Sequence, residues 1–239
     1  MPLILRKCNY NGYSSRNFYY GNAGDIATCP DWNPNPRCGN GLHGLKEGNG
    51  DWNLLSGDDW LVIETNDEDV VNIDKDKCKF RTGKILFRGS DTELANSEFP
   101  AKLNLNSKCA YLWAFYIGNH DVMMHKITES EWAYNWAFYI GNHDVMMHKI
   151  TDSKFAYYWA LNIGNEDVMI DKITESKYAY YWALNIGNED VMINKITSSY
   201  WAIEWAEHIG NHDVMKPKVT DPEFIERWNL CFPENPIIT

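Results

Sequence analysis

The chain has 239 residues and a formal net charge of −11 at pH 7, from 22 lysines and arginines against 33 acidic residues. This length is enough for two modest domains, and the acidic balance argues against direct binding to a nucleic-acid backbone, because clustered Lys and Arg neutralise phosphates. No apolar run reaches the about 18 residues of a membrane-spanning helix, and no basic-then-apolar start indicates a signal peptide.

The six cysteines include no Cys-x-x-Cys pair and do not form the pattern of a disulfide framework. Cys109 falls on an inward-facing position of a helical repeat, and Cys231 falls in the terminal cap of that repeat array. We therefore expect a cytoplasmic protein without membrane association, and we expect neither a cofactor nor a bound metal.

Residues 1–100 contain short runs of β-type residues that are separated by clusters of Gly, Asn, Asp and Pro. Such runs predict strands. They are Leu3–Leu5, Trp60–Ile63, Val70–Ile73 and Lys84–Phe87. We expect a small β-rich domain with a long loop from Cys29 to Asp59, and a helix or connector from Glu93 to Ser107.

The long loop contains a dense motif that runs from Cys29 to Gly44 and includes Cys38-Gly-Asn-Gly-Leu-His43. It resembles a domain of uncharacterised function found in bacteriophage and bacterial proteins, which is marked by Cys-x-x-Gly-Leu-His. In that domain a Trp-Leu-Val strand and an Asp-Lys-containing strand pair follow, and Trp60-Leu61-Val62 and Asp76-Lys77-Cys78-Lys79 fit this order. The resemblance implies phage ancestry, and with it a host cytoplasm, but it transfers no activity.

One interpretation of the motif is a structural metal site. Cys29, Cys38, His43 and either Cys8 or Cys78 have the ligand types of structural zinc, although their spacing is irregular. The sequence alone does not choose between the two possible fourth ligands.

A second interpretation is a catalytic site. His43-Gly44 follows an apolar residue and is similar to the nicotinamide-cradling His-Gly pair of ADP-ribosyltransferases. That similarity implies Tyr19 or Tyr20, together with Glu64, as catalytic partners. The third interpretation, which we prefer, is a glycine-rich turn in which His43 and Cys38 pack or hydrogen-bond to hold the loop.

From Lys108 to Pro222 the chain repeats itself every 23 residues. Five copies start at residues 108, 131, 154, 177 and 200, and a partial sixth copy, which we interpret as a cap, starts at residue 223. A fixed short period is typical of stacked supersecondary units. We therefore predict an α+β protein, with a β-rich domain over 1–100 and an α-solenoid of five helical hairpins over 101–239. The helical copies also resemble short Ala-Tyr-rich repeats of uncharacterised phage proteins.

The fourth copy shows what each unit is expected to form. An apolar stripe at helical spacing predicts a first helix. The stripe consists of Tyr178, Ala179, Trp182, Ala183 and Ile186. Thr174 is expected to be the N-cap of this helix, as Thr128 is at an earlier junction in a capping box with Glu131, and Gly187 is expected to end it.

A second, shorter helix is expected to follow, capped by Asn188, with Val191, Met192 and Ile196 facing inward. The core of the stack is predicted to be a column of tryptophans at 23-residue spacing. They are Trp113, Trp136, Trp159, Trp182, Trp205 and Trp228.

The outward positions of the repeat differ between copies and are the expected recognition surface. His120 and His143 share one position with Glu166 and Glu189, and Asp171 lies at another variable position. Stacked histidines could bind a transition metal, but the substitutions between copies favour a solvated polar face. These five residues are therefore the predicted partner-binding residues.

No P-loop, GxSxG, HExxH or dinucleotide fingerprint occurs in the chain. We expect a non-enzymatic, phage-encoded binding protein, whose solenoid binds and inhibits a host protein or defence complex. An enzyme with a site at His43, Glu64 and Tyr20 and a structural or assembly component of a virion are the two alternative functions.

Overall fold

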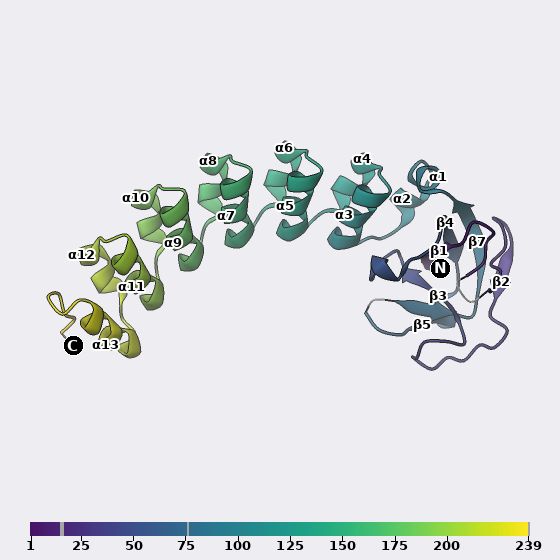
Figure 1. Cartoon of the computed structure of the whole chain (residues 1–239), viewed down its shortest axis with the longest axis horizontal. Coiled ribbons are helices and arrows are strands. Elements are labelled where there is room, and N and C mark those ends of the chain that lie inside the picture. Colours follow the sequence, from purple (N-terminus) through teal and green to yellow (C-terminus); the bar gives the residue numbers. More distant parts are fainter. Residues whose placement is uncertain (15–16, 76, 239) are drawn as a thin grey trace. The chain divides into compact units, whose positions relative to one another are not determined.

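The computed structural model describes residues 1–14, 17–75 and 77–238, so Asp76 of the predicted motif lies outside the described residues. The protein is mixed α+β, with an antiparallel sheet in the N-terminal region and helices in the C-terminal part (Figure 1). The chain forms two compact units, Met1–Trp132 (the sheet unit) and Ala133–Thr239 (the helical unit). The sheet unit therefore includes the first pair of repeat helices as well as the sheet.

Seven strands form one sheet with the order β2-β7-β4-β1-β3-β6-β5, and all neighbours are antiparallel. The strands are β1 Leu3–Cys8, β2 Ile26–Thr28, β3 Leu42–Lys46, β4 Asp59–Glu64, β5 Val70–Asn72, β6 Cys78–Phe80 and β7 Thr82–Gly89. All four predicted strands are confirmed. The long loop expected from Cys29 to Asp59 is wrong in part, because β3 and the 3-10 helix η1 (Trp52–Leu54) lie within it.

Both faces of the sheet are covered, which explains why four consecutive residues of β4, from Trp60 to Ile63, are buried. One face carries a cluster that includes Ile4, Leu61 and Phe80. On the other face Trp52 packs against Trp60 and Trp113, with ring centroids 5.6 Å and 6.1 Å away. The first repeat helix thus shares a core with the sheet.

The predicted connector from Glu93 to Ser107 contains two short helices, α1 Asp91–Ala95 and α2 Phe99–Lys102. Ser90 and Glu93 form a capping box at the start of α1. Phe99 of α2 packs edge-on against Phe87 of β7 at 5.9 Å between ring centroids. The connector is therefore anchored on the sheet.

In the rest of the described chain, a ten-residue helix and a four-residue helix alternate. The ten-residue helices are α3 Ser107–Tyr116, α5 Ser130–Tyr139, α7 Ser153–Asn162, α9 Ser176–Asn185, α11 Ser199–His208 and α13 Pro222–Cys231. The four-residue helices are α4 His120–Met123, α6 His143–Met146, α8 Glu166–Met169, α10 Glu189–Met192 and α12 His212–Met215, each followed by a 3-10 turn.

Glycine and asparagine separate the long helix from the short one, as predicted. At the end of α9 the carbonyl of Trp182 accepts hydrogen bonds from Ile186 and Gly187, at 2.8 Å and 3.0 Å. Gly187 has φ +114° and Asn188 has φ +56°, conformations that favour these two residue types. Two consecutive positive φ angles produce the sharp turn that lets the short helix fold back.

The predicted caps at Thr174 and Thr128 are wrong. Helix α9 begins at Ser176, after Glu175 as N-cap, and α5 begins at Ser130. The hydroxyl oxygen of Ser153, in the preceding copy, instead accepts the backbone N–H groups of Thr174 and Glu175, at 2.8 Å and 3.2 Å. The junction is therefore stabilised from the neighbouring copy and not by its own threonine.

Within the helical unit a lysine makes the second connection between neighbouring copies. Nζ of Lys195 donates to the carbonyls of Ile170 and Ile173 in the preceding copy, at 2.7 Å and 2.8 Å, and Lys218 repeats these bonds one copy later. The ammonium is thus a further donor to the carbonyl of Ile170, which already accepts the backbone N–H of Ile173 at 3.3 Å, and it also bonds the carbonyl at the end of this 3-10 turn. Within the helical unit, α7 contacts α9, α9 contacts α11, and α11 contacts α13.

The six repeat tryptophans are fully buried, as predicted. Met192 and Ile196 are also buried, whereas Val191 is 44% exposed, so its predicted inward orientation is wrong. After α13 the chain turns back on itself, and the Trp228 indole N–H donates to the carbonyl of Asn235 at 2.9 Å. Among the described residues, no helix combines the length and apolar character needed to cross a bilayer.

Candidate functional site

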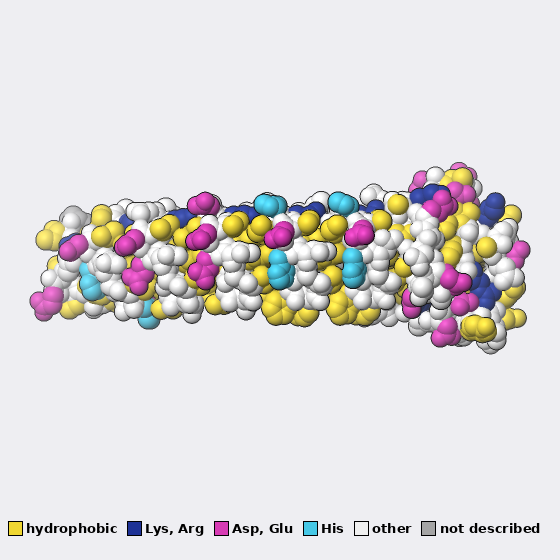
Figure 2. Space-filling view, turned by 90° about the horizontal axis from the view of Figure 1, so that it is seen from above, with side chains coloured by type: hydrophobic (Ala, Val, Ile, Leu, Met, Phe, Trp, Pro, Cys, Tyr) yellow, Lys and Arg dark blue, Asp and Glu magenta, His cyan; other side chains and the backbone are white. Residues whose placement is uncertain are grey.

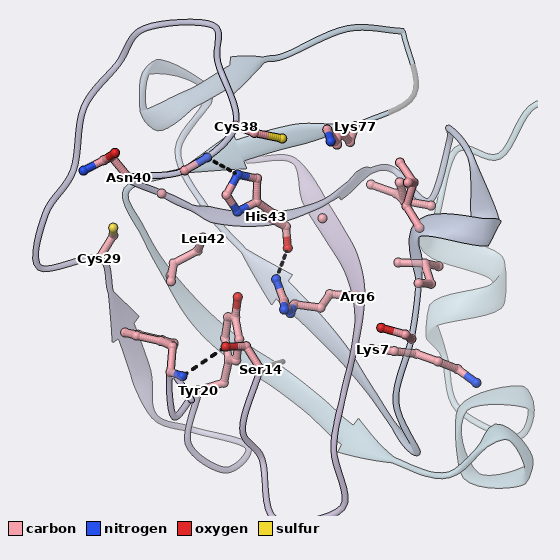
Figure 3. Close-up of a pocket in the computed structure, with 18 of the residues that line it drawn as sticks. Arg6, Lys7, Ser14, Tyr20, Cys29, Cys38, Asn40, Leu42, His43 and Lys77 are labelled. Atoms are coloured by element: carbon pink, nitrogen blue, oxygen red, sulfur yellow. Dashed lines mark hydrogen bonds between the residues drawn. The ribbon is translucent and has the colours of Figure 1, made fainter. Parts of the chain in front are cut away.

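A cavity of about 450 Å³ lies in the sheet unit around His43 (the His43 cavity). Its walls come from β1, from β3 and from the loops that precede β3, with Arg6, Tyr20, Cys29, Cys38, Asn40 and His43 among the lining residues (Figure 3). The predicted motif therefore does form the wall of a concave site. A cavity of this size fits a small molecule.

The loop that carries Cys38 is attached to the sheet by Lys79, which the sequence motif placed only in an expected strand pair. Lys79 lies on β6 and is fully buried. Its Nζ donates to the Asn35 side chain and to the carbonyls of Arg37 and Gly39, at 3.2 Å, 2.9 Å and 3.2 Å. Since a buried ammonium is costly unless it is hydrogen-bonded, these bonds fix the loop on the sheet.

His43 points its ring toward the loop. Its Nε2 accepts a hydrogen bond from the backbone N–H of Gly39 at 3.3 Å, so in the neutral ring Nδ1 carries the hydrogen. Its carbonyl accepts a hydrogen bond from Nη1 of Arg6 at 2.6 Å. These bonds support the expected role of His43 in holding a glycine-rich turn.

Tyr20 lines the same cavity as His43, and its side chain is 3% exposed. Burial raises its pKa to about 12, and the nearby Arg6 guanidinium, 4.4 Å from the ring centroid, only partly offsets this effect. The phenol therefore stays protonated at neutral pH.

The structure does not gather the proposed catalytic residues. Tyr20 and His43 both line the cavity, but Glu64 does not. Glu64 is paired with Leu3 at the far end of β1, which places it about 10 Å along the strand from Arg6.

Among the five candidate zinc ligands, Cys29 and Cys78 bond different partners. Cys29 and Cys38 line the cavity with His43, but the Cys29 thiol donates to Asp31 at 3.1 Å. The buried Cys78 thiol donates to the carbonyl of Gly44 at 3.3 Å. Burial raises the pKa of Cys78 to about 11, which disfavours the thiolate that a metal needs. Cys8 is buried as well.

Glu204, Glu207 and His208 form the one group of three potential ligands found in residues 1–14, 17–75 and 77–238, with ligand atoms within 4.8 Å. The position between the two carboxylates is already taken by Arg227, whose Nη2 lies 2.7 Å from Glu204 and 3.3 Å from Glu207. This cluster is therefore an ion-pair network between α11 and α13.

The predicted partner-binding residues are all exposed: His120, His143, Glu166, Asp171 and Glu189. The rings of both histidines nevertheless hydrogen-bond the backbone of the preceding long helix. Nε2 of His143 donates to the carbonyl of Ala137 at 3.0 Å, and His120 does the same to Ala114 at 3.1 Å. The ring of His143 also packs edge-on against Trp159.

A surface on the short helices was not predicted from the sequence. Each short helix carries an Asp-Val pair (the Asp-Val positions), and in the helical unit all eight side chains are exposed. They are Asp144-Val145, Asp167-Val168, Asp190-Val191 and Asp213-Val214. Figure 2 shows acidic and hydrophobic side chains recurring over this edge. The clue in the sequence was that the pair is unchanged in all five copies.

Comparison with known proteins gives no relative: no family model matches the chain, no curated protein matches it, and no solved structure matches it.

The burial of Tyr20 predicts a loss of stability at high pH. In the unfolded chain a tyrosine ionises near pH 10, whereas Tyr20 in the folded protein ionises near 12. The folded state thus holds a proton that the unfolded state releases, so stability falls between pH 10 and 12 by roughly 3 kcal/mol for this group. Urea unfolding of wild type and Tyr20→Phe across this pH range measures the effect. The variant should lose clearly less stability, and parallel curves would contradict the prediction.

Proposed function

We propose that this chain is a non-enzymatic binding protein, whose repeats stack as an α-solenoid of five helical hairpins and present the Asp-Val positions to a partner protein. The support for stacking is that helices in the helical unit contact their neighbours in order, and that Lys195 and Ser153 bond the adjoining copy. Such neighbour-only contacts are the property that defines a solenoid.

The binding role rests on one observation: an Asp-Val pair is the same in all five copies although the fold does not explain its valine. Most residues that recur in all five copies serve the fold itself, since Trp182 is core, Lys195 bonds carbonyls, and Gly187 and Asn188 form the turn. The Asp-Val positions recur equally, but in the helical unit their side chains are partly open to solvent. An aspartate in a first helical turn gains some dipole energy, about 0.3–1 kcal/mol, but no comparable argument accounts for a valine exposed to water.

The chemistry of this surface defines the partner. The valines of the helical unit are 40%, 40%, 44% and 45% exposed, and each adjoins a carboxylate. None of the four aspartate side chains takes part in an ion pair within the described part of the chain. A partner that offers basic groups beside apolar ones, repeated from copy to copy, is complementary to it.

The neighbouring variable positions supply selectivity in this proposal. Glu166 and Glu189 each directly precede an Asp-Val pair, where His143 stands in another copy, and Asp171 follows in the next turn. The constant pair would thus provide common affinity, and the variable residues would decide which partner is preferred. A host protein or defence complex as the inhibited partner rests on the resemblance to phage proteins alone.

The test is affinity purification from host cells with two matched variants. In the first, Asp144, Asp167, Asp190 and Asp213 are changed to Asn. In the control, four exposed carboxylates elsewhere, Glu175, Glu223, Glu226 and Glu234, are changed to Gln. Both variants lose four charges, so only the position differs.

We expect a near-stoichiometric partner with wild type and with the control, and at least a tenfold weaker complex with the Asp→Asn variant. His43→Ala should keep the partner. Equal capture by both charge variants would refute the proposed surface. An enzymatic activity that disappears in His43→Ala, without a stable partner, would favour the alternative of a catalytic site in the sheet unit.

A further inference from the structure

Arg6 brings a positive charge to the His43 cavity without an acidic partner. It lies on the central strand β1 and forms none of the ion pairs found among the described residues. Among the described lining residues Asp31 is the one carboxylate, and its two oxygens accept hydrogen bonds from the Cys29 thiol and the Asn40 amide, at 3.1 Å and 2.8 Å. Arg6, Lys7 and Lys77 are the basic residues of this lining, so in the described part of the wall positive charges outnumber negative ones, within a protein of net charge −11.

The hydrogen bonds of Arg6 leave one edge of its guanidinium for a ligand. Nη1 donates to the carbonyl of His43, and the guanidinium plane lies over the ring of Tyr20. Nε is buried and has no hydrogen-bond acceptor. Since Nε is closed to solvent, a ligand in the cavity first meets Nη2, which makes no hydrogen bond within the described part of the chain, and it reaches Nε after a shift of the side chain. The Nε–Nη2 edge of a guanidinium matches the two oxygens of a carboxylate or phosphate.

Two further polar residues belong to the cavity wall. Tyr20, which stays protonated at neutral pH, and Asn40 line the cavity together with Arg6 (Figure 3). The rest of the lining mixes polar residues with apolar ones, which include Phe18, Leu54 and Leu55. A charged group beside apolar side chains fits an amphiphilic ligand.

We propose that the His43 cavity binds a small molecule that carries one oxyanion group, a phosphate monoester or a carboxylate, on an apolar or aromatic body. Arg6 holds the oxyanion and fixes its orientation, and the leucines surround the body. This site lies within the sheet unit and does not depend on the binding role of the repeats. The bonds of Lys79 to the Cys38 loop attach this part of the cavity wall to the sheet.

The experiment is a titration of the full-length protein, followed by amide NMR shifts, with three probes of similar size: phenyl phosphate, benzoate and neutral benzyl alcohol. Arg6→Gln removes the positive charge. Arg6→Lys keeps the charge but removes the paired N–H donors of the guanidinium. Arg81→Gln is the matched control, because Arg81 is exposed and does not line the cavity. Leu54→Trp, at a residue that is 48% exposed on the cavity wall, obstructs the site without changing a core position.

We expect saturable binding of at least one anion with a Kd of about 1 mM or below, shifts around Arg6 and His43, and at least tenfold weaker binding in Arg6→Gln and Leu54→Trp. Arg6→Lys should weaken it less, and Arg81→Gln should match wild type. The tighter of the two anions identifies the oxyanion.

Three results would overturn the proposal. They are no binding of either anion up to about 10 mM, benzyl alcohol binding as tightly as the anions, or unchanged binding in a folded Arg6→Gln protein. Should Arg6→Gln fail to fold, Leu54→Trp decides in its place, and unchanged binding there has the same meaning.

Discussion

Trp182→Ala should lower the free energy of unfolding of the helical unit by about 3–5 kcal/mol, the range typical of removing a large aromatic side chain from a core. Trp182 is fully buried in α9, which packs against α7 on one side and α11 on the other. The substitution therefore leaves a cavity in α9, where it packs against α7 and α11. Urea unfolding followed by circular dichroism at 222 nm measures this change.

Trp182→Phe is the informative control. The indole N–H of Trp182 is buried and has no hydrogen-bond acceptor, as is the case for Trp159 and Trp205. Phenylalanine removes this unpaired donor while it keeps most of the apolar volume, so the loss should be less than half of that in Trp182→Ala. A loss as large as that of alanine would show that the indole N–H has a bonding role, and a neutral Trp182→Ala would contradict the core assignment.

The helical part of the fold was predictable because its signals are periodic. The tryptophan at position 182 recurs six times, and the pair Gly187-Asn188 recurs five times, each at 23-residue spacing. Several copies therefore indicate the same local structure. The errors concern residues whose partner lies in another copy. Thr174 has the side chain of an N-cap, yet its backbone N–H bonds Ser153, 21 residues earlier, and no local pattern reveals such a bond.

Val191 shows a different limit of sequence patterns. Its apolar side chain favoured an inward orientation, but the turn at Gly187 and Asn188 rotates the short helix so that Met192 points to the core and Val191 to solvent. A four-residue helix is too short for its periodicity to fix which face is buried.

In the sheet unit the sequence indicated the motif but not its neighbours. His43 and Cys38 were selected by residue type and do lie at a cavity. Arg6 and Lys79 were missed, because a charged residue within a short strand pattern looks like an outward-facing one. The pairing of β1 with β3 brings the Arg6 side chain to the backbone carbonyl of His43. The pairing of β3 with β6 brings the Lys79 side chain to the Cys38 loop. Only these pairings show the two contacts.

An in-register deletion tests the proposed solenoid most severely. Removal of residues 154–176 joins Ser153 to Lys177 and places Lys195 opposite Met147 and Ile150, the same carbonyls that Lys172 now bonds at 2.6 Å and 2.8 Å. Every bond between neighbours is thereby restored. We expect a protein that is shorter by one copy, keeps its helical spectrum and unfolds cooperatively.

The matched control removes fewer residues but breaks the register. Deletion of residues 154–170 leaves a turn of the third copy without its long helix, so Trp159 is lost from the core and Ser153 no longer reaches the junction at Thr174. Thermal unfolding by circular dichroism should show a cooperative transition for the 23-residue deletion and none for the shorter one. If the larger deletion unfolds the chain, or both behave alike, the copies do not act as stacked units, and the binding surface proposed on them loses its scaffold.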